Sequence, residues 1–216
     1  MIEAQILVLA KEPRPGHVKT RLCPPLTPDQ AARVAGAAIG DTLDAVRSLD
    51  VAARVLVLDG SAAALDTSGF DVQSQGAGGL DRRLAEAFDT AYDTRPLPLL
   101  LIGMDTPQVT ARQLHEALQV LLADGTDAVL GLAQDGGWWA LGLRRPDAGL
   151  LVGVPMSSDV TGQRQQERLD AAGLRTRALP VLRDIDDVED LRAAAVTSPS
   201  RRVAAVVAEL LSGSAA

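Results

Sequence analysis

Aromatic residues are scarce in this 216-residue sequence, of which Trp, Phe and Tyr make up only 2%. The apolar fraction of 47% is nevertheless ordinary for a globular protein, so alanine, valine and leucine must build the core. At this length one α/β domain can bury a sizeable core, and no internal repeat or composition shift marks a second domain. We therefore expect a single domain over residues 1–211, followed by a frayed tail at 212–216.

Cysteine and histidine are nearly absent as well. Cys23 is the only cysteine, which excludes an internal disulfide bond and a cysteine-rich metal site, and no histidine is placed to activate it as a nucleophile. His17 and His115 are too isolated to form a metal site, although His17 lies among cations and is a candidate phosphate contact. The sequence also lacks a Walker A motif, a Gly-x-Gly-x-x-Gly fingerprint and a serine in a nucleophile elbow.

Long hydrophobic runs and an excess of positive charge are missing too. No apolar run approaches the ~20 residues that a helix needs to span a bilayer, and the N-terminus shows no signal-peptide pattern. The net charge of −7 argues against a nucleic-acid partner, because proteins that bind nucleic acid present a basic face. We expect a cytoplasmic protein with no membrane span and no nucleic-acid partner, and the sequence makes no prediction of an oligomer.

Against this acidic balance, one loop concentrates positive charge. A strand-like apolar run at 6–10 leads directly into it, and its candidate nucleotide-binding residues are Lys11, Arg14, Gly16, Lys19 and Arg21. Open α/β sheets bind ligands at the carboxyl end of such a strand, and cations with free backbone N–H groups suit phosphate. The sequence therefore predicts that the loop binds a nucleotide.

Apolar runs alternate with helix-like segments along the chain, which favours βαβ units and a mostly parallel sheet. Capping boxes at Thr27–Gln30 and Thr110–Gln113 mark two helix starts. Strands are expected at 6–10, 51–58, 70–74, 97–103, 128–132, 138–143 and 175–179. Helices are expected at 28–48, 80–92, 110–123, 160–172, 187–195 and 200–211.

Asp105 follows the almost wholly apolar run 97–103, as expected after a central parallel strand. At the carboxyl end of that strand it would face the same crevice as the basic loop. A carboxylate there suits Mg²⁺ or Mn²⁺, which bridge one or two carboxylates to substrate phosphates. The alternative, equally open, is an aspartate that only caps the turn before the helix at 110.

A second cluster of candidates is Asp135-Gly136-Gly137-Trp138-Trp139. Its plain interpretation is a hairpin turn between two strands. Two adjacent tryptophans on a strand face opposite sides, so one can pack in the core while the other meets a ligand. We therefore take Asp135 as a catalytic candidate and the four residues after it as candidate cleft residues.

The segment Asp184-Ile185-Asp186-Asp187 can be a strand end with two acids on one side, or a helix N-terminus. Asp187 is the better cap for the helix expected at 187–195. Asp184 or Asp186 then remains as a second metal ligand, and we choose Asp186.

The segment 75–84 is predicted to be a flexible loop that enters a helix. Its candidates for holding the nucleotide are Gln75 and Arg83, and the alternative interpretation is a plain linker.

Taken together and in this order, these segments resemble bacterial nucleotide-diphospho-sugar transferases of the GT-A fold. That family was long grouped as a domain of unknown function, and its members are labelled glycosyltransferases, with one branch linked to arsenosugar biosynthesis. A more distant similarity extends to phospholactate and molybdenum-cofactor guanylyltransferases. The motifs that carry the resemblance are Lys11-x-Pro13-x-x-Gly16-x-Val18-Lys19-Thr20-Arg21-Leu22, Asp41-Thr42, Gly103-x-Asp105-x-Pro107, Gly131-x-x-x-Asp135-Gly136-Gly137-Trp138-Trp139-x-x-Gly142 and Asp184-Ile185-Asp186.

The resemblance implies a single-domain three-layer α/β/α sandwich in which Lys11, Lys19 and Arg21 contact phosphates. It also implies that Asp105 holds a divalent ion and that Asp135 with its two glycines lines the donor–acceptor cleft. Two departures stand out. The family's usual Gly-Asp-Leu-Gly-x-Arg is here Gly78-Gly79-Leu80-Asp81-Arg82-Arg83, and its usual Pro-Trp-Ser is Pro155-Met156-Ser157.

The leading hypothesis is a metal-dependent glycosyltransferase that moves a sugar from a nucleoside-diphosphate sugar to a small-molecule acceptor. The ion on Asp105 would neutralise the leaving diphosphate together with Lys19, and Asp135 would orient or deprotonate the acceptor hydroxyl. One alternative is a nucleotidyltransferase that joins an NTP to a phosphorylated small molecule and releases pyrophosphate. Another is a nucleotide-binding protein without catalysis. Gly16 is the only glycine between Lys11 and Arg21. A loop that binds a triphosphate is expected to be richer in glycine, so this scarcity favours sugar transfer over nucleotidyl transfer.

Overall fold

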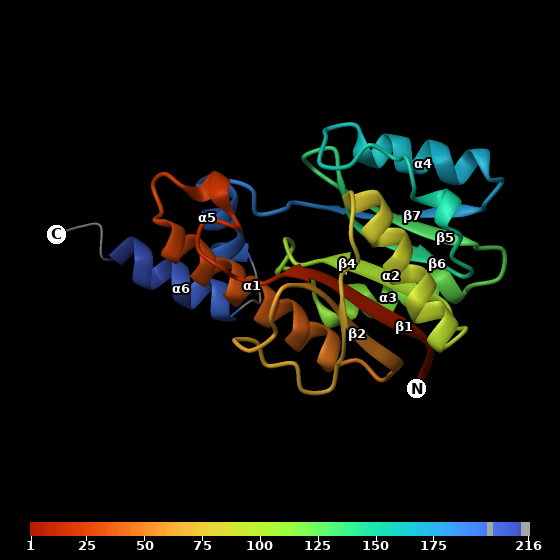
Figure 1. The fold of residues 1–216 in the computed structure, drawn as a ribbon, viewed down its shortest axis with the longest axis horizontal. Coiled ribbons are helices and arrows are strands. Elements are labelled where there is room, and N and C mark those ends of the chain that lie inside the picture. Colours follow the sequence, from red (N-terminus) through yellow and green to blue (C-terminus); the bar gives the residue numbers. More distant parts are fainter. Residues whose placement is uncertain (198–200, 213–216) are drawn as a thin grey trace.

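One seven-stranded sheet, in the order β3-β2-β1-β4-β6-β5-β7, organises the computed structural model, which describes residues 1–197 and 201–212 (Figure 1). Of the described strands, β6 alone runs antiparallel to its neighbours, as expected of a hairpin return after β5, so the prediction of a mostly parallel sheet is confirmed. The strands are β1 (Ile2–Lys11), β2 (Val51–Asp59), β3 (Asp71–Ser74), β4 (Leu99–Gly103), β5 (Ala128–Ala133), β6 (Trp138–Leu143) and β7 (Thr176–Leu182).

Helices cover both faces of the sheet and complete the three layers. The helices are α1 (Pro28–Arg47), α2 (Leu80–Thr94), α3 (Ala111–Leu122), α4 (Thr161–Ala171), α5 (Val188–Thr197) and α6 (Arg201–Ser212), with short 3₁₀ turns η1 (Thr20–Leu22) and η2 (Ala148–Leu150). Ile39 of α1 and Leu114 of α3 share one buried cluster, while Leu84 of α2 and Leu169 of α4 share another across the sheet. The expected α/β/α sandwich is therefore confirmed. None of the described helices combines the length and apolar character that a membrane crossing requires.

Both predicted capping boxes are present, and they fix where two helices begin. Thr27 accepts from the Gln30 backbone N–H at 3.2 Å, and Gln30 Oε1 accepts from the Thr27 N–H at 2.8 Å. The same reciprocal pair joins Thr110 and Gln113 at the start of α3. Because Thr110 caps α3, Asp105 is not needed for that purpose.

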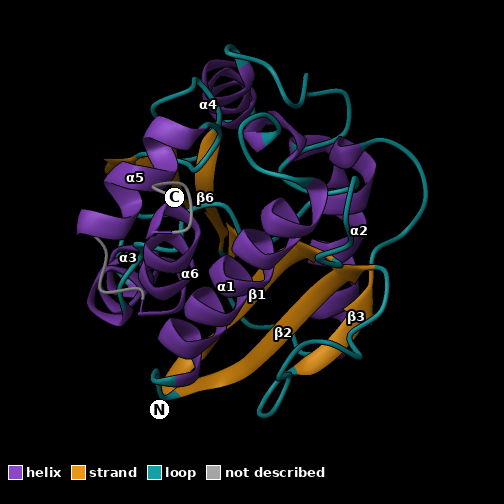
Figure 2. Cartoon of the chain, turned by 90° about the vertical axis from the view of Figure 1, so that its left-hand side faces the viewer, coloured by secondary structure: helices purple, strands orange, loops and turns teal. Residues whose placement is uncertain are grey.

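A third buried cluster lies outside the sandwich, where α5 and α6 pack against α1 (Figures 1 and 2). Leu22 and Ile185 belong to it, so the basic loop and the segment after β7 meet beside the same helix. Of the tail expected at 212–216, Ser212 ends α6 and residues 213–216 lie outside the described residues.

Asp41 of α1 fastens α6 to this cluster. Its buried carboxylate accepts from the backbone N–H groups of Arg202 at 3.2 Å and Val203 at 3.0 Å, in the first turn of α6. Such N–H groups have no partner within their helix and carry partial positive charge.

We expect Asp41→Ala to lower the free energy of unfolding by about 1–3 kcal/mol, measured by urea unfolding. The control Asp44→Ala removes a half-exposed carboxylate that pairs with the Arg47 and Arg202 side chains, and we expect it to cost less than about 1 kcal/mol. Equal losses in the two variants would contradict this role for Asp41.

Candidate active site

The candidate site lies where the carboxyl ends of the parallel strands meet. Because β1, β4, β5 and β7 run in the same direction, the segments that follow them emerge at one edge of the sheet. Asp105 follows β4, Asp135 follows β5 and Asp184 follows β7, while β6 begins at this edge with Trp138. Strand direction thus gathers residues that are distant in the sequence.

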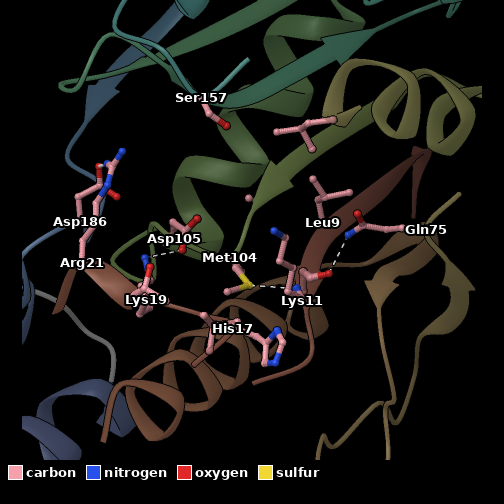
Figure 3. Close-up of a pocket in the computed structure, with 15 residues that line it drawn as sticks. Leu9, Lys11, His17, Lys19, Arg21, Gln75, Met104, Asp105, Ser157 and Asp186 are labelled. Atoms are coloured by element: carbon pink, nitrogen blue, oxygen red, sulfur yellow. Dashed lines mark hydrogen bonds and ion pairs between the residues drawn. The ribbon is translucent and has the colours of Figure 1, made fainter. Parts of the chain in front are cut away.

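A first cavity of about 320 Å³ opens between the basic loop and β4 (Figure 3). We call it the basic cavity. The ionisable residues that line it are Lys11, His17, Lys19, Arg21, Asp105 and Asp186. Arg14 is not among the lining residues, and its Nη2 lies 3.2 Å from His17 Nδ1 at the surface. Gly16, at φ +76°, lies in the left-handed region, so it serves the turn rather than a close approach.

Lys19 lies at the carboxyl end of β4, where two polar contacts hold its side chain. Its backbone has φ 49°, and its side chain is only 6% exposed. The ammonium group donates to the carbonyl of Ile185 and forms an ion pair with Asp105 (Figure 3). The Ile185 N–H in turn donates to the Asp105 carbonyl at 3.0 Å. The basic loop, the end of β4 and the segment after β7 are therefore joined at one point.

A second cavity, of about 200 Å³, lies beside the first and is lined by the carboxylates Asp105, Asp135 and Asp184. We call it the acidic cavity. The cavity is also lined by leucines, by Trp138 and Met156, and by hydroxyl residues at the start of α4. The residues that line both cavities are Leu9, Leu80, Gly103, Asp105 and Ser157. Asp105 is the one carboxylate that both share among the described residues.

The turn between β5 and β6 is the predicted hairpin, and it is also part of the acidic cavity. Asp135 Oδ1 accepts from the Gly137 N–H at 2.8 Å, which orients the carboxylate. Gly136 has φ +89°, and a Cβ there would lie 1.9 Å from the Asp159 carbonyl oxygen. The Gly162 N–H donates to the Gly136 carbonyl at 2.8 Å, so the glycines let this turn pack directly against the start of α4.

The two tryptophans take opposite sides of β6, as expected. Trp139 is 2% exposed, and its Nε1 donates to the Pro180 carbonyl at 3.0 Å. Trp138 is half-buried and lines the acidic cavity. Of the pair, Trp138 is the one placed to meet a ligand.

The acidic segment after β7 divides between three tasks. Asp187 accepts from the N–H groups of Glu189 and Asp190 and so caps α5, as predicted. Asp186 lines the basic cavity and pairs with Arg21 at 2.8 Å. Asp184 enters the acidic cavity, and its buried Oδ1 has no hydrogen-bond partner among the described residues. Burial, with the nearby charges of Asp135 and Asp105, raises the pKa of Asp184 from 3.8 to about 7.

Gln75 and Arg83 are occupied within the fold. Gln75 Nε2 donates to the carbonyls of Ala10 at 2.8 Å and Val57 at 3.2 Å, and its Oε1 accepts from Arg83 Nη1 at 2.8 Å. Gln75 still lines the basic cavity, whereas Arg83 is not among the lining residues. Their arrangement secures the ends of β1 and β2 from beneath the cavity.

The two departures from the family pattern lie beside the acidic cavity. Asp81 in the first turn of α2 accepts from the Gly153 N–H at 2.9 Å, which ties α2 to the loop before α4. Met156 and Ser157 in that loop line the cavity. Ser158 and Thr161 also line the cavity and were not predicted; the signal in the sequence is a run of hydroxyl residues before a helix.

These residues fit a divalent cation only in part. No group of three or more His, Cys, Asp or Glu side chains in the described part of the chain is arranged to hold a metal ion. Burial first, and the charges of Asp135 and Asp105 second, raise the pKa of the Asp184 carboxyl, whose Oδ1 has no partner among the described residues; a cation beside it would stabilise the ionised form. Mg²⁺ in nucleotide sites takes one or two carboxylates and completes its shell with phosphate oxygens and water. The donor set therefore fits an ion that arrives with a phosphate ligand.

The pKa of Asp184 predicts a pH-dependent stability. Between pH 3.8 and about 7 the folded chain keeps a proton that the unfolded chain has lost, so the free energy of unfolding falls as pH rises. We expect Asp184→Asn to remove this fall. The Tm of the variant minus the Tm of the unsubstituted protein should therefore increase from pH 5 to pH 8, measured in the presence of EDTA. The control Asp124→Asn, at an exposed carboxylate, is expected to leave the pH profile parallel to that of the unsubstituted protein. A parallel profile for Asp184→Asn would show that its pKa is ordinary.

Comparison with known proteins assigns the chain to a protein family. Residues 42–158, more than half of the sequence, match the family described as "Uncharacterized protein conserved in bacteria (DUF2064)". The chain belongs to this family. A protein from Desulfovibrio desulfuricans G20, provisionally named a nucleotide-diphospho-sugar transferase, is 25% identical to this DUF2064 chain with a TM-score of 0.84, over 97% of this chain and 98% of that one. The family resemblance and the fold expected from the sequence are confirmed.

Two further solved structures share the fold. Rv0371c from Mycobacterium tuberculosis H37Rv, in complex with manganese, is 24% identical with a TM-score of 0.54 over 88% of this chain and 97% of that one. CMP:2-keto-3-deoxy-manno-octonic acid synthetase, complexed with CTP, is 14% identical with a TM-score of 0.56 over 90% and 98%. No curated protein sequence matches this DUF2064 chain significantly.

Proposed function

We propose that this protein is a metal-dependent glycosyltransferase that moves a sugar from a nucleoside-diphosphate sugar to a small acceptor. The observation that carries the proposal is the junction of a basic and an acidic cavity at Asp105. The anionic diphosphate of a donor suits the basic cavity, and its reacting sugar carbon would lie at the shared wall by Asp105, beside the acidic cavity that contains Asp135. The provisional name of the Desulfovibrio protein supports the donor class, and the manganese complex of Rv0371c supports a divalent ion.

In this proposal the basic cavity binds the diphosphate through Lys11, Lys19 and Arg21. Asp105, with Asp184 or Asp186, would hold Mg²⁺ or Mn²⁺, which supplies positive charge to the leaving diphosphate. Lys19 adds charge at the same place because its ammonium already lies against Asp105.

Asp135 is the proposed acceptor-side base. The acceptor oxygen forms a bond to the anomeric carbon as the bond from that carbon to the diphosphate oxygen breaks. The electron pair of the broken bond stays on the diphosphate, and the acceptor proton passes to Asp135. The Gly137 N–H bond to Asp135 Oδ1 fixes the carboxylate for this step.

The second candidate is a nucleotidyltransferase, which joins an NTP to a phosphorylated small molecule. Its support is the fold that this chain shares with the synthetase complexed with CTP and with a cytidylyltransferase from Leptospira borgpetersenii. The loop from Lys11 to Arg21 contains a single glycine, Gly16, whereas a loop around a triphosphate is expected to be richer in glycine, so this feature favours sugar transfer.

Thermal unfolding against a panel of NDP-sugars and NTPs, with and without Mn²⁺, tests these proposals. A ligand that binds only the folded chain raises the Tm, so the panel needs no acceptor. We expect a manganese-dependent rise with one NDP-sugar. A rise with an NTP alone would replace sugar transfer by nucleotidyl transfer. A rise without turnover over a broad acceptor panel would favour a non-catalytic nucleotide-binding protein.

A further inference from the structure

The two cavities differ sharply in the charge of their walls. The basic cavity has three cationic side chains and one imidazole against two carboxylates. The acidic cavity has three carboxylates, and none of the described residues that line it is Lys, Arg or His. The walls therefore present opposite electrostatic environments on either side of Asp105.

The negative charge of its lining determines which ligands can enter the acidic cavity. A phosphate or carboxylate there would face Asp135, and none of the described residues that line the cavity is cationic; Lys19 reaches Asp105 from the basic cavity and is already paired with it, and juxtaposed like charges are costly. A cation held on Asp105, with or without Asp184, would be balanced by its carboxylate ligands and by the donor diphosphate, so Asp135 would remain as the negative charge on the acceptor side. Hydroxyl and ammonium groups, in contrast, donate hydrogen bonds to carboxylates.

The size and the apolar lining of the acidic cavity restrict the range of possible ligands further. Its volume of about 200 Å³ admits a small molecule. Leu80, Leu84 and Leu101 form one side, and the ring of Trp138 and the side chain of Met156 also line it. Such walls suit the apolar face of a ring or short chain whose hydroxyl groups point toward the carboxylates.

We propose that the acidic cavity selects an acceptor that is uncharged or cationic, carries a hydroxyl group, and bears no phosphate or carboxylate. This inference rests on the proposed function, since it assigns the second substrate of the same site. It also separates the two candidate reactions, because nucleotidyl transfer to a phosphorylated molecule requires an anion in this cavity.

The charge of the cavity can be measured without turnover, because Trp138 lines it and the chain has only one other tryptophan, the buried Trp139. We would quench tryptophan fluorescence with caesium ion and with iodide at constant ionic strength. The contribution of Trp138 is obtained by subtracting the signal of Trp138→Phe, so no substitution of the core residue Trp139 is needed. We expect the quenching constant of Trp138, divided for each ion by that of free N-acetyltryptophanamide, to be roughly two- to tenfold larger for caesium than for iodide.

The double variant Asp135→Asn/Asp184→Asn should remove that preference, while the control Asp59→Asn, at a carboxylate outside the cavity lining, should keep it. If the normalised quenching constants of Trp138 for iodide and caesium are equal in the unsubstituted protein, the proposal is overturned.

Matched acceptors give the second test, with release of NDP or pyrophosphate as the readout. The pairs are glycerol with glycerol 3-phosphate, methyl glucoside with glucose 6-phosphate, and ethanolamine with phosphoethanolamine. We expect turnover only with unphosphorylated members, and Met156→Lys, which brings an ammonium to the cavity wall, should raise use of the phosphorylated ones. Preference for a phosphorylated member would overturn the inference. A caesium preference together with no response to any NDP-sugar or NTP would instead refute the proposed function and leave the charge selection standing.

Discussion

Replacement of Asp105 by asparagine is expected to lower manganese-dependent turnover by about 10²-fold or more, with the fold retained. Asp105 follows β4 at the shared wall of the two cavities, and its side chain is 47% exposed, so its carboxylate is open to an ion. Asparagine keeps the shape but loses the negative charge that would hold the cation beside the diphosphate. The measurements are NDP release at saturating Mn²⁺, the Kd for Mn²⁺ in the presence of nucleotide, and the Tm.

Asp186→Asn provides the matched control. Asp186 lies at the same edge of the sheet but pairs with the exposed guanidinium of Arg21. We expect this variant to lose less than tenfold in turnover if Asp184 completes the ion's ligands. A loss equal to that of Asp105→Asn would assign the second ligand to Asp186, which is the residue predicted from the sequence. Unchanged turnover and an unchanged manganese requirement in Asp105→Asn would refute the metal assignment.

The features that local chemistry determines were predictable from the sequence. The capping boxes at Thr27 and Thr110 use residues three positions apart, and both helices begin where those boxes predict. The hairpin at Asp135–Gly137 and the alternation of Trp138 and Trp139 depend on neighbours only, and both are found. The edge of the sheet that gathers the candidate residues follows from parallel strand direction.

The features that depend on distant contacts were not predictable. Lys19 donates to the carbonyl of Ile185, and no local pattern shows that these segments meet. The choice between Asp184 and Asp186 depends on how the chain turns after β7, where the Ile185 N–H bonds to Asp105. Gln75 lines the basic cavity, and its bonds to the carbonyls at the ends of β1 and β2 were not visible in the sequence; its contact with a nucleotide stays a prediction. Polar side chains in loops serve ligands or backbone alike, and tertiary contacts decide which.

Replacement of Lys19 by methionine is expected to change metal and nucleotide affinity in opposite directions. The ammonium group forms an ion pair with Asp105, so in the absence of ligand it competes with a divalent cation for that carboxylate. Methionine matches the aliphatic stem without the charge, and we expect Mn²⁺ alone to bind more tightly. Nucleotide binding should weaken about tenfold or more, because a charge-assisted hydrogen bond to phosphate contributes roughly 1.5–3 kcal/mol. Both affinities are measured by isothermal titration calorimetry.

Lys11→Met distinguishes this competition from a general loss of positive charge. Lys11 lines the same cavity from the end of β1, and no ion pair joins it to Asp105 among the described residues. Its replacement should weaken nucleotide binding and leave the affinity for Mn²⁺ alone unchanged within about twofold. If both variants tighten Mn²⁺ binding equally, the field of the whole loop rather than the Lys19–Asp105 pair opposes the ion. If Lys19→Met weakens Mn²⁺ binding, Lys19 supports the arrangement of Asp105 through the carbonyl of Ile185, and its ammonium is a structural clamp rather than a competitor.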